Sequence, residues 1–282
     1  LKTLCAMLAI CTSTISFVAL THEVALPKTI DDFSLYRISP KVYVVHGIQA
    51  LPDETNAAFM SNSGIVLTDA GVVIIDSGGS LEVGRRLVAE IRTLSDHPVV
   101  AVFNSHLHGD HWLGNEAIHE NYPDARFYAH SRAIDRIEAG AGTEWSDIIA
   151  RMIGQASNAG VPIFPSNALE GGETLTIGGI EFNIHHTGHA HTDGDIMIEL
   201  PGSRLLFAGD IIEHGRAVSS DVPQDFDIKG QIEAIRFALV LPVDTYVPGH
   251  GSTGGPGVAR AALRFLETLH ASVKVHYESG MM

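Results

Sequence analysis

Residues 104–115 read Asn-Ser-His-Leu-His-Gly-Asp-His-Trp-Leu-Gly-Asn, and the rest of the chain is best interpreted outward from this stretch. His106 and His108 alternate, so both side chains can reach one ion from an extended segment or a tight loop. Asp110 and His111 come from the next turn and can face a second ion. Imidazole and carboxylate groups are suitable ligands for zinc, so we expect a metal site here.

The segments on either side of this stretch predict an α/β fold, from alternating or apolar runs for strands and 3.6-residue periodicity for helices. The predicted strands are Val42–His46, Ala57–Asn62, Ile65–Thr68, Val72–Ile75, Val99–Phe103, Arg126–Ala129, Glu173–Ile177, Ile180–His186, Asp195–Leu200, Arg204–Phe207 and Thr245–Val247. The predicted helices are Leu81–Leu94, Arg132–Met152 interrupted at Gly140–Thr143, Phe226–Val240 and Val258–Val275. Strands followed by helix and strand, twice over, predict two mixed sheets packed face to face with helices on the outer faces.

The composition excludes several classes of protein. With 45% hydrophobic and 18% charged residues in 282, the chain is globular rather than disordered. Its formal net charge of −15 repels phosphate backbones and argues against nucleic acid as a partner. The two cysteines, Cys5 and Cys11, both lie in the first apolar stretch, so the rest of the chain offers no thiolate nucleophile or metal ligand.

The beginning of the chain predicts a targeting segment. The run Leu4–Leu20 is apolar or small and follows Lys2, which is typical of a secretory signal peptide within residues 1–25. An uncleaved N-terminal anchor is the alternative. We therefore expect an exported, periplasmic protein, with no later segment long enough to span a bilayer and no stable membrane domain after removal of the leader. Residues 35–278 are expected to form a single domain.

The His-x-His-x-Asp-His pattern formed by His106, His108, Asp110 and His111 resembles the signature of the metallo-β-lactamase superfamily. Three further stretches, at residues 185–195, 207–210 and 247–251, are similar to the later metal motifs of that family and occur in the same order. The resemblance covers nearly all of the chain after the leader. It implies a single hydrolase domain built as an αββα sandwich of two mixed β-sheets.

The resemblance also implies a set of metal ligands. They would be His106, His108 and His191 on a first ion, Asp110, His111 and His250 on a second ion, and Asp210 as the bridge between them. His189 is the alternative to His191, but Thr192, Asp193 and Gly194 follow His191 as the family pattern requires. The cofactor implied is two Zn²⁺ ions, although iron or manganese tolerates the same ligands.

The implied chemistry is hydrolysis of a small molecule. Zinc lowers the pKa of a bound water to about 7, which makes a nucleophile for a carbonyl carbon available at neutral pH. Asp110 is the expected catalytic residue, because it can orient that nucleophile and relay its proton. Two divalent ions, two carboxylates and a hydroxide leave about one positive charge, which favours a substrate with an anionic group.

The substrate class follows from the bridging residue. An Asp at position 210 resembles the branch of the family that cleaves thioesters, esters and lactones, whereas many zinc β-lactamases carry a Cys there. β-Lactam hydrolysis is the alternative. A diiron oxidoreductase and a non-catalytic metal protein are further alternatives, and the complete ligand set argues against the last of these. The sequence predicts no oligomeric state.

Four residues outside the ligand set are candidates for supporting roles. Asp76 either supports a ligand histidine or caps the turn before the helix at Ser80. His189 either supports the ligands or lines the pocket. His214 and Arg216 follow Asp210 closely and are expected at the pocket edge, where Arg216 either holds a substrate carboxylate or is solvated.

Three aromatic residues, Phe59, Trp112 and Trp145, are candidates for an apolar wall of the pocket. Packing of Trp145 within its own helix is the simpler alternative for that residue.

Overall fold

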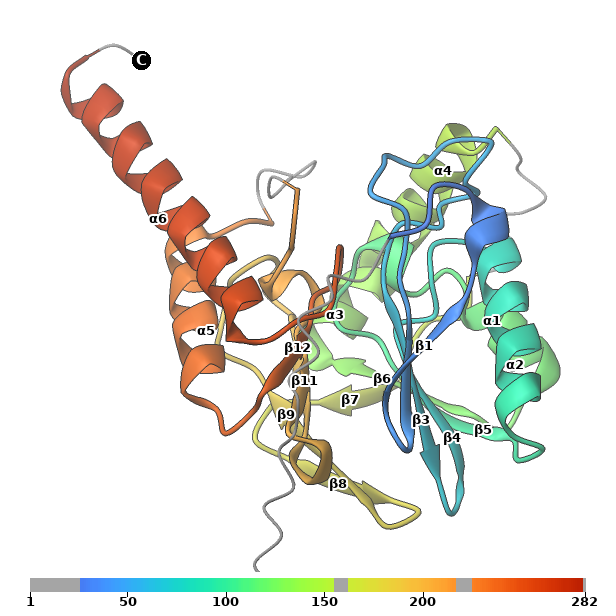
Figure 1. Ribbon diagram of the computed structural model, residues 1–282. Helices are drawn as coiled ribbons and strands as arrows, with labels where there is room; N and C mark the ends of the chain where they lie inside the picture. The colour runs from blue at the N-terminus through green and yellow to red at the C-terminus, as the bar shows by residue number, and fades with distance from the viewer. Residues whose placement is uncertain (1–25, 155–161, 217–224, 281–282) are drawn as a thin grey trace, which may run out of the picture.

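The computed structural model describes residues 26–154, 162–216 and 225–280, so the predicted signal peptide lies outside the described residues. Two β-sheets lie face to face with helices on their outer sides, which confirms the predicted αββα sandwich (Figure 1). No helix within the described ranges is both long and apolar enough to cross a membrane.

The larger sheet has seven strands in the order β1 to β7 along the chain. Strands β1 to β4 pair antiparallel, whereas β4 to β7 pair parallel, so the sheet is mixed. Parallel pairing places the carboxyl ends of β4, β5 and β6 at one edge. The bounds are β1 Leu35–Ser39, β2 Val42–Val45, β3 Ser63–Thr68, β4 Gly71–Ile75, β5 Val99–Phe103, β6 Arg126–His130 and β7 Asn167–Leu169.

The smaller sheet has five strands in the order β12-β11-β10-β9-β8. Its one parallel pair, β11 with β12, again places two carboxyl ends together. The bounds are β8 Thr174–Ile177, β9 Ile180–His185, β10 Met197–Leu200, β11 Leu205–Phe207 and β12 Thr245–Val247.

The core between the sheets is apolar and fully closed. Phe103 from the larger sheet and Phe182 from the smaller one lie with ring centroids 5.5 Å apart. Ile198 and Phe207 pack into the same cluster. Burial of this kind contributes about 25 cal/mol per Å² of apolar area, so the two inner faces hold the sandwich together.

Helices cover the outer faces of both sheets (Figure 1). Helix α1 begins after Ser80, whose side chain accepts a hydrogen bond from the backbone N–H of Val83, and packs with Leu87 and Ile91 against the larger sheet. Helices α5 and α6 cover the smaller sheet. The bounds are α1 Leu81–Leu94, α2 Asn115–Asn121, α3 Ser131–Arg136, α4 Gly142–Met152, α5 Ile228–Val240 and α6 Pro256–Glu278.

The sequence interpretation was wrong at one predicted strand and missed two others. Residues Ala57–Asn62 form turns instead of a strand, and Ala57 and Ala58 have φ of 49° and 62°, in the left-handed region. The apolar run Ala57–Met60 reflects burial of a loop rather than pairing in a sheet. Strands β1 and β7 were not predicted. The interruption predicted at Gly140–Thr143 is present, because Gly140 has a φ of 129° between α3 and α4.

Candidate metal centre

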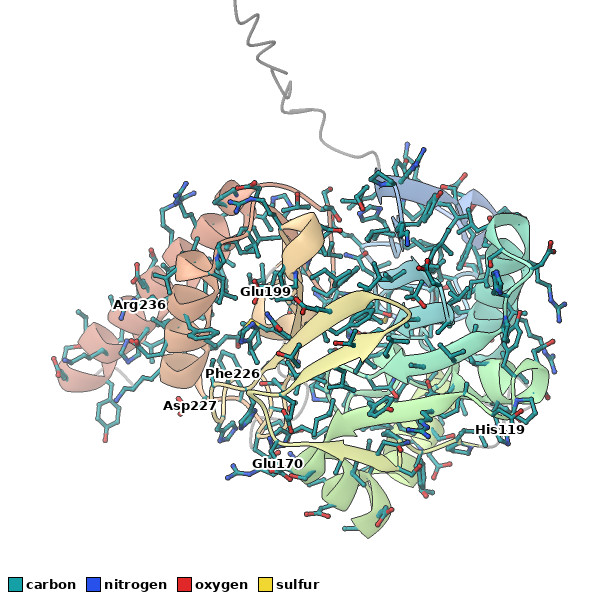
Figure 2. The ribbon with its side chains drawn as sticks, turned by 90° about the horizontal axis from the view of Figure 1, so that it is seen from below. His119, Glu170, Glu199, Phe226, Asp227 and Arg236 are labelled. Atoms are coloured by element: carbon teal, nitrogen blue, oxygen red, sulfur yellow. The ribbon has the colours of Figure 1, made fainter. Side chains whose placement is uncertain are left out.

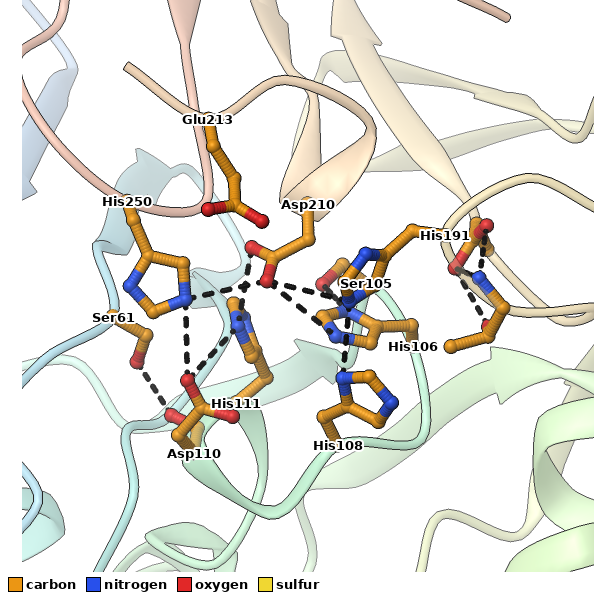
Figure 3. Close-up of polar contacts among 12 residues, drawn as sticks. Ser61, Ser105, His106, His108, Asp110, His111, His191, Asp210, Glu213 and His250 are labelled. Atoms are coloured by element: carbon orange, nitrogen blue, oxygen red, sulfur yellow. Dashed lines mark hydrogen bonds and ion pairs between the residues drawn. The ribbon is translucent and has the colours of Figure 1, made fainter. Parts of the chain in front are cut away.

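The sequence-predicted ligands come together where loops from both sheets meet. His106, His108, Asp110 and His111 follow β5, and the last two lie in a 3-10 turn at Gly109–His111. The loop from β9 to β10 carries His191, Asp210 follows β11 and His250 follows β12. Each ligand is thus presented from a strand end or a loop anchored by two strands, as Figure 3 shows.

Close backbone approach around Asp210 depends on a glycine. A Cβ placed on Gly249 would lie 1.9 Å from Oδ1 of Asp210, far inside any permitted contact. Gly249 therefore lets the segment carrying His250 pass directly beside Asp210. This explains why glycine precedes the last ligand in the sequence.

The first group of ligands consists of His106, His108 and His191, which we call the first half-site. One ligand atom from each lies within 4.8 Å of the others. Nδ1 of His108 lies 3.0 Å from Nε2 of His191. All three side chains are buried. Three imidazoles at this spacing match the three protein ligands of a zinc site that leaves one position open.

The second group consists of Asp110, His111 and His250, which we call the second half-site. Their ligand atoms also lie within 4.8 Å of one another. Oδ2 of Asp110 lies 3.2 Å from Nε2 of His250 and 3.4 Å from Nε2 of His111. These three residues are buried as well.

Asp210 lies between the two half-sites. Its Oδ2 is 3.5 Å from Nε2 of His191 and 3.3 Å from Nε2 of His250, while its Oδ1 is 3.4 Å from Nε2 of His111 (Figure 3). One carboxylate thus contacts histidines of both groups. The structure therefore places all seven predicted ligands in one continuous cluster.

The cluster fits a bound metal because several buried atoms have no other partner. Nε2 of His106, His111 and His250 and Oδ1 of Asp210 are buried without a hydrogen bond to any described residue. Buried polar atoms without a partner cost free energy, and proteins rarely tolerate several in one place. Cations accepting these lone pairs would remove that cost.

The two half-sites differ in their protonation. Burial lowers the pKa of His106 well below its ordinary value and lowers the pKa of His191 to about 3. Burial alone would do the same at His111 and His250, but the carboxylates beside them outweigh it. Asp110, Asp210 and Asp76 raise the pKa of His111 well above its ordinary value, and Asp210 and Asp110 raise that of His250 to about 9.

A second layer of contacts holds the ligand rings, and Asp76 belongs to it. Oδ2 of Asp76 lies 2.9 Å from Nδ1 of His111, and its two oxygens also accept from the backbone N–H and hydroxyl of Ser105. These contacts of Asp76 go to Ser105 and His111, and helix α1 is capped by Ser80 itself. Nδ1 of His250 donates to the Met60 carbonyl at 2.8 Å. These contacts direct Nε2 of both rings toward the cluster.

Sequence reasoning missed other members of this layer. Ser105 Oγ lies 3.0 Å from Nδ1 of His106, and Asp225 Oδ2 lies 3.4 Å from Nε2 of His108. Ser105 stands within the decisive motif and could have been found there. Asp225 is 117 positions from His108 and belongs to no motif, so only the fold reveals it.

The other residues predicted near the site differ in their positions relative to the pocket. Nε2 of His189 lies 2.6 Å from the carbonyl oxygen of Asp225, so this residue supports a loop and is not one of the clustered ligands. Nδ1 of His214 lies 3.1 Å from the Ser252 carbonyl oxygen. Arg216 does line the pocket, where its Nε is 2.6 Å from Oε2 of the buried Glu213.

The pocket opens over Asp110 and Asp210 and has a largely apolar wall. Phe59 and Trp112 are not part of this wall, because both are fully buried in the core, whereas Trp145 lines the pocket and lies 4.6 Å from the His108 ring centroid. The apolar lining comes from two elements, the β2–β3 loop and helix α4: Leu51, Pro52, Met60, Trp145, Ile148, Ile149 and Met152.

The αββα fold and the buried His/Asp cluster define a metal-dependent hydrolase. The family model described as the metallo-beta-lactamase superfamily matches residues 57–250, more than half of the chain. This chain therefore belongs to the metallo-β-lactamase superfamily, as its motifs predicted.

The sequence relatives carry names of more than one activity. The chain is 23% identical over 230 residues to a metallo-beta-lactamase type 2 of Bacteroides fragilis, covering 81% of this chain and 83% of the relative. It is 24% identical over 168 residues to a linear primary-alkylsulfatase of Pseudomonas sp. (strain ATCC 19151). That match spans 51% of this chain but only 32% of the relative.

Solved structures of the same fold are also similar. A metallo-beta-lactamase from Pontibacter korlensis superimposes with a TM-score of 0.64 at 23% identity, covering 83% of this chain and 99% of that one. A metallo beta lactamase from Hirschia baltica gives a TM-score of 0.64 at 18% identity, with 83% and 97% covered. At this identity the likeness establishes the fold and leaves the substrate open.

Proposed function

We propose that this chain is a dizinc hydrolase of small ester, thioester or lactone substrates. The observation that carries this proposal is the position of Asp210, whose carboxylate lies within 3.5 Å of His191 in one half-site and 3.3 Å of His250 in the other. A carboxylate shared in this way suits two cations held side by side.

The residues of the cluster have distinct roles in the proposed hydrolysis. Zinc, when bound, supplies a water of lowered pKa and polarises the carbonyl oxygen of the substrate. Asp110 lines the pocket, and its carboxylate orients the attacking water and receives its proton. The other ligand side chains hold their positions throughout, because strand ends and buried contacts fix them.

The pocket indicates which part of the substrate lies where. Leu51 and Met152 both line the pocket and are 63% and 38% exposed, although both are large and apolar. We infer that Leu51 and Met152 contact an apolar group of the substrate beside its carbonyl. Among the described lining residues, Arg216 is the one arginine, and its pairing with Glu213 offsets its charge, so we assign recognition of an anionic group to the metal cluster.

β-Lactam hydrolysis is the second candidate. It is favoured by the similarity to the Bacteroides fragilis enzyme over 81% of this chain. We rank β-lactam hydrolysis behind hydrolysis of esters, thioesters and lactones, because Asp210 rather than a cysteine lies between the half-sites. Nucleic acid is not an expected partner, given the net charge of −15.

Export is part of the proposal. The apolar run Leu4–Leu20 after Lys2 supports a signal peptide and a periplasmic location for the folded domain.

The test is a substrate panel assayed with zinc-loaded protein. It contains chromogenic esters, a thioester, a lactone and a chromogenic cephalosporin, each with wild type and with Asp210→Ala. Turnover of an ester, thioester or lactone that is lost in Asp210→Ala supports the proposal. Turnover of the cephalosporin alone makes β-lactam hydrolysis the function. Absence of turnover on every substrate by protein holding two zinc ions contradicts the proposed reaction class.

A further inference from the structure

We propose that Asp225, held by Arg136, is a positioning residue that fixes His108 for metal binding and ties it to the loop carrying His191. This inference rests on the metal site of the proposed function but is independent of the substrate. Its basis is a chain of contacts that joins three segments distant in the sequence.

His108 is contacted on both ring nitrogens. Nδ1 faces Nε2 of His191 at 3.0 Å, on the side of the metal cluster. Nε2 lies 3.4 Å from Oδ2 of Asp225, and both side chains are buried. A carboxylate at Nε2 keeps the proton on that nitrogen and leaves the Nδ1 lone pair for a metal ion. The ring of Trp145, whose centroid is 4.6 Å away, restricts rotation of the imidazole.

Arg136 holds the carboxylate of Asp225 in place. Arg136 is the last residue of helix α3, and its Nη2 lies 2.6 Å from Oδ1 of Asp225. The two oxygens of Asp225 are therefore divided between Arg136 and His108. Nη1 of the same guanidinium lies 3.1 Å from Oδ1 of Asp193, two positions after His191 in the sequence. One arginine thus connects the neighbourhoods of two ligands of the first half-site.

Hydrogen bonds to main-chain carbonyl groups also hold the segment at Asp225 beside the His191 loop. Nε2 of His189 lies 2.6 Å from the carbonyl oxygen of Asp225, and the N–H of Asp227 donates to the Ala190 carbonyl at 2.8 Å. Figure 2 shows Phe226 and Asp227 at the edge of the smaller sheet, where the chain enters α5. Asp225 therefore keeps a fixed position relative to the His191 loop, and His189 has a structural role in this arrangement.

The primary experiment measures metal affinity instead of turnover. In Asp225→Asn the charge and the pairing with Arg136 are lost while the side-chain shape is kept. We expect affinity for one of two zinc ions to fall about 10- to 100-fold in competition with a chelator, as for other residues that support metal ligands. The visible spectrum of cobalt(II) at that site should change, because the orientation of His108 changes.

The matched control is Asp244→Asn. Asp244 is an exposed aspartate that also pairs with an arginine, Arg204, at 2.5 and 2.9 Å. Its substitution should leave both zinc affinities and the cobalt spectrum unchanged. Thermal unfolding of each metal-free variant shows whether it is folded.

Arg136→Gln is the second variant, because it keeps Asp225 and removes only the guanidinium that holds its carboxylate. We expect a smaller loss of affinity at the same site and a cobalt spectrum changed in the same direction. Folded Asp225→Asn and Arg136→Gln proteins with wild-type affinity and spectrum would overturn the inference. A wild-type chain that binds no zinc would instead overturn the metal site itself, so the two failures are distinguishable.

Discussion

The two half-sites of the cluster each contain three buried side chains but differ in charge. The first contains three histidines, and burial lowers the pKa of His106 and His191. The second contains Asp110, and carboxylates raise the pKa of His111 and His250. Without metal, protons therefore occupy the second half-site at neutral pH, whereas His106 and His191 of the first half-site are neutral. Metal can therefore bind His106 and His191 in the first half-site without displacing protons, whereas in the second half-site it must displace protons from His111 and His250.

The half-sites also differ in what supports them. Asp76, directly after β4, and the Met60 carbonyl hold the histidines of the second half-site. In the first half-site, Ser105 contacts His106, whereas Asp225 and Arg136, which join separate loops, hold His108. We therefore expect changes at Asp225 or Arg136 to affect the first half-site, and changes at Asp76 to affect the second half-site most.

The largest effect is expected when the residue common to both half-sites is removed. Asp210→Ala deletes the carboxylate that contacts His191, His250 and His111. We expect kcat/KM to fall by about 10³-fold or more, since charge stabilisation at both positions is lost. Steady-state kinetics with the best ester measures this, with Asp244→Ala as the control. A loss below about tenfold would show that the half-sites act independently of Asp210.

Lowering the pH should weaken zinc binding at the second half-site more than at the first. The pKa of His250 is about 9 without metal, so below pH 9 zinc must displace a proton there. Each unit of decreasing pH then lowers the affinity about tenfold for the His250 proton alone, or about 100-fold from pH 8 to pH 6, and the raised pKa of His111 adds to this loss. The pKa of His191 is about 3, so His191 contributes no such dependence in this range. Chelator competition at several pH values checks this, and parallel weakening of both ions would contradict the comparison.

Asp76→Asn should weaken the second half-site more than the first, because Asp76 contacts His111 directly and reaches His106 only through Ser105. Asn is tolerated at the left-handed backbone position of Asp76, whose φ is 56°, so the main chain should be retained. Loss of the charge beside Nδ1 of His111 should lower zinc affinity about tenfold or somewhat more. Titration of cobalt(II) followed by absorbance separates the two sites. A greater loss at the same ion in both Asp76→Asn and Asp225→Asn would refute the division of support.

The smallest effect is expected at the apolar wall, outside both half-sites. Leu51→Ser removes an exposed apolar side chain from the pocket mouth. Contact with the substrate there is worth about 1 kcal/mol, so kcat/KM for esters with long acyl chains should fall about fivefold. Acetyl esters should be hardly affected. Val240→Ser, which changes an exposed residue of α5, is the control, and equal losses for short and long esters would remove Leu51 from substrate recognition.

The sequence predicted the sandwich and its seven-residue ligand cluster because those features depend on local patterns. His106, His108, Asp110 and His111 stand within six positions, and the later ligands follow strand-like runs. The turns at Ala57–Asn62 were predicted as a strand because a buried loop can contain the same kind of short apolar run as a buried strand. Local sequence cannot distinguish these two causes.

The supporting residues show the other limit of sequence reasoning. Arg136 and Asp225 are 89 positions apart, and neither belongs to a recognisable motif. Their pairing depends on how α3, the His191 loop and the segment before α5 pack in three dimensions. Such contacts follow from the fold as a whole and appear only once the fold is known.

The central claim is that seven side chains form two adjacent metal sites joined by Asp210. The most direct measurement is the number of zinc ions retained per chain after equilibrium dialysis against zinc at pH 8, determined by elemental analysis. The account predicts two zinc ions per wild-type chain. Retention of one ion or none by folded wild-type protein would contradict it.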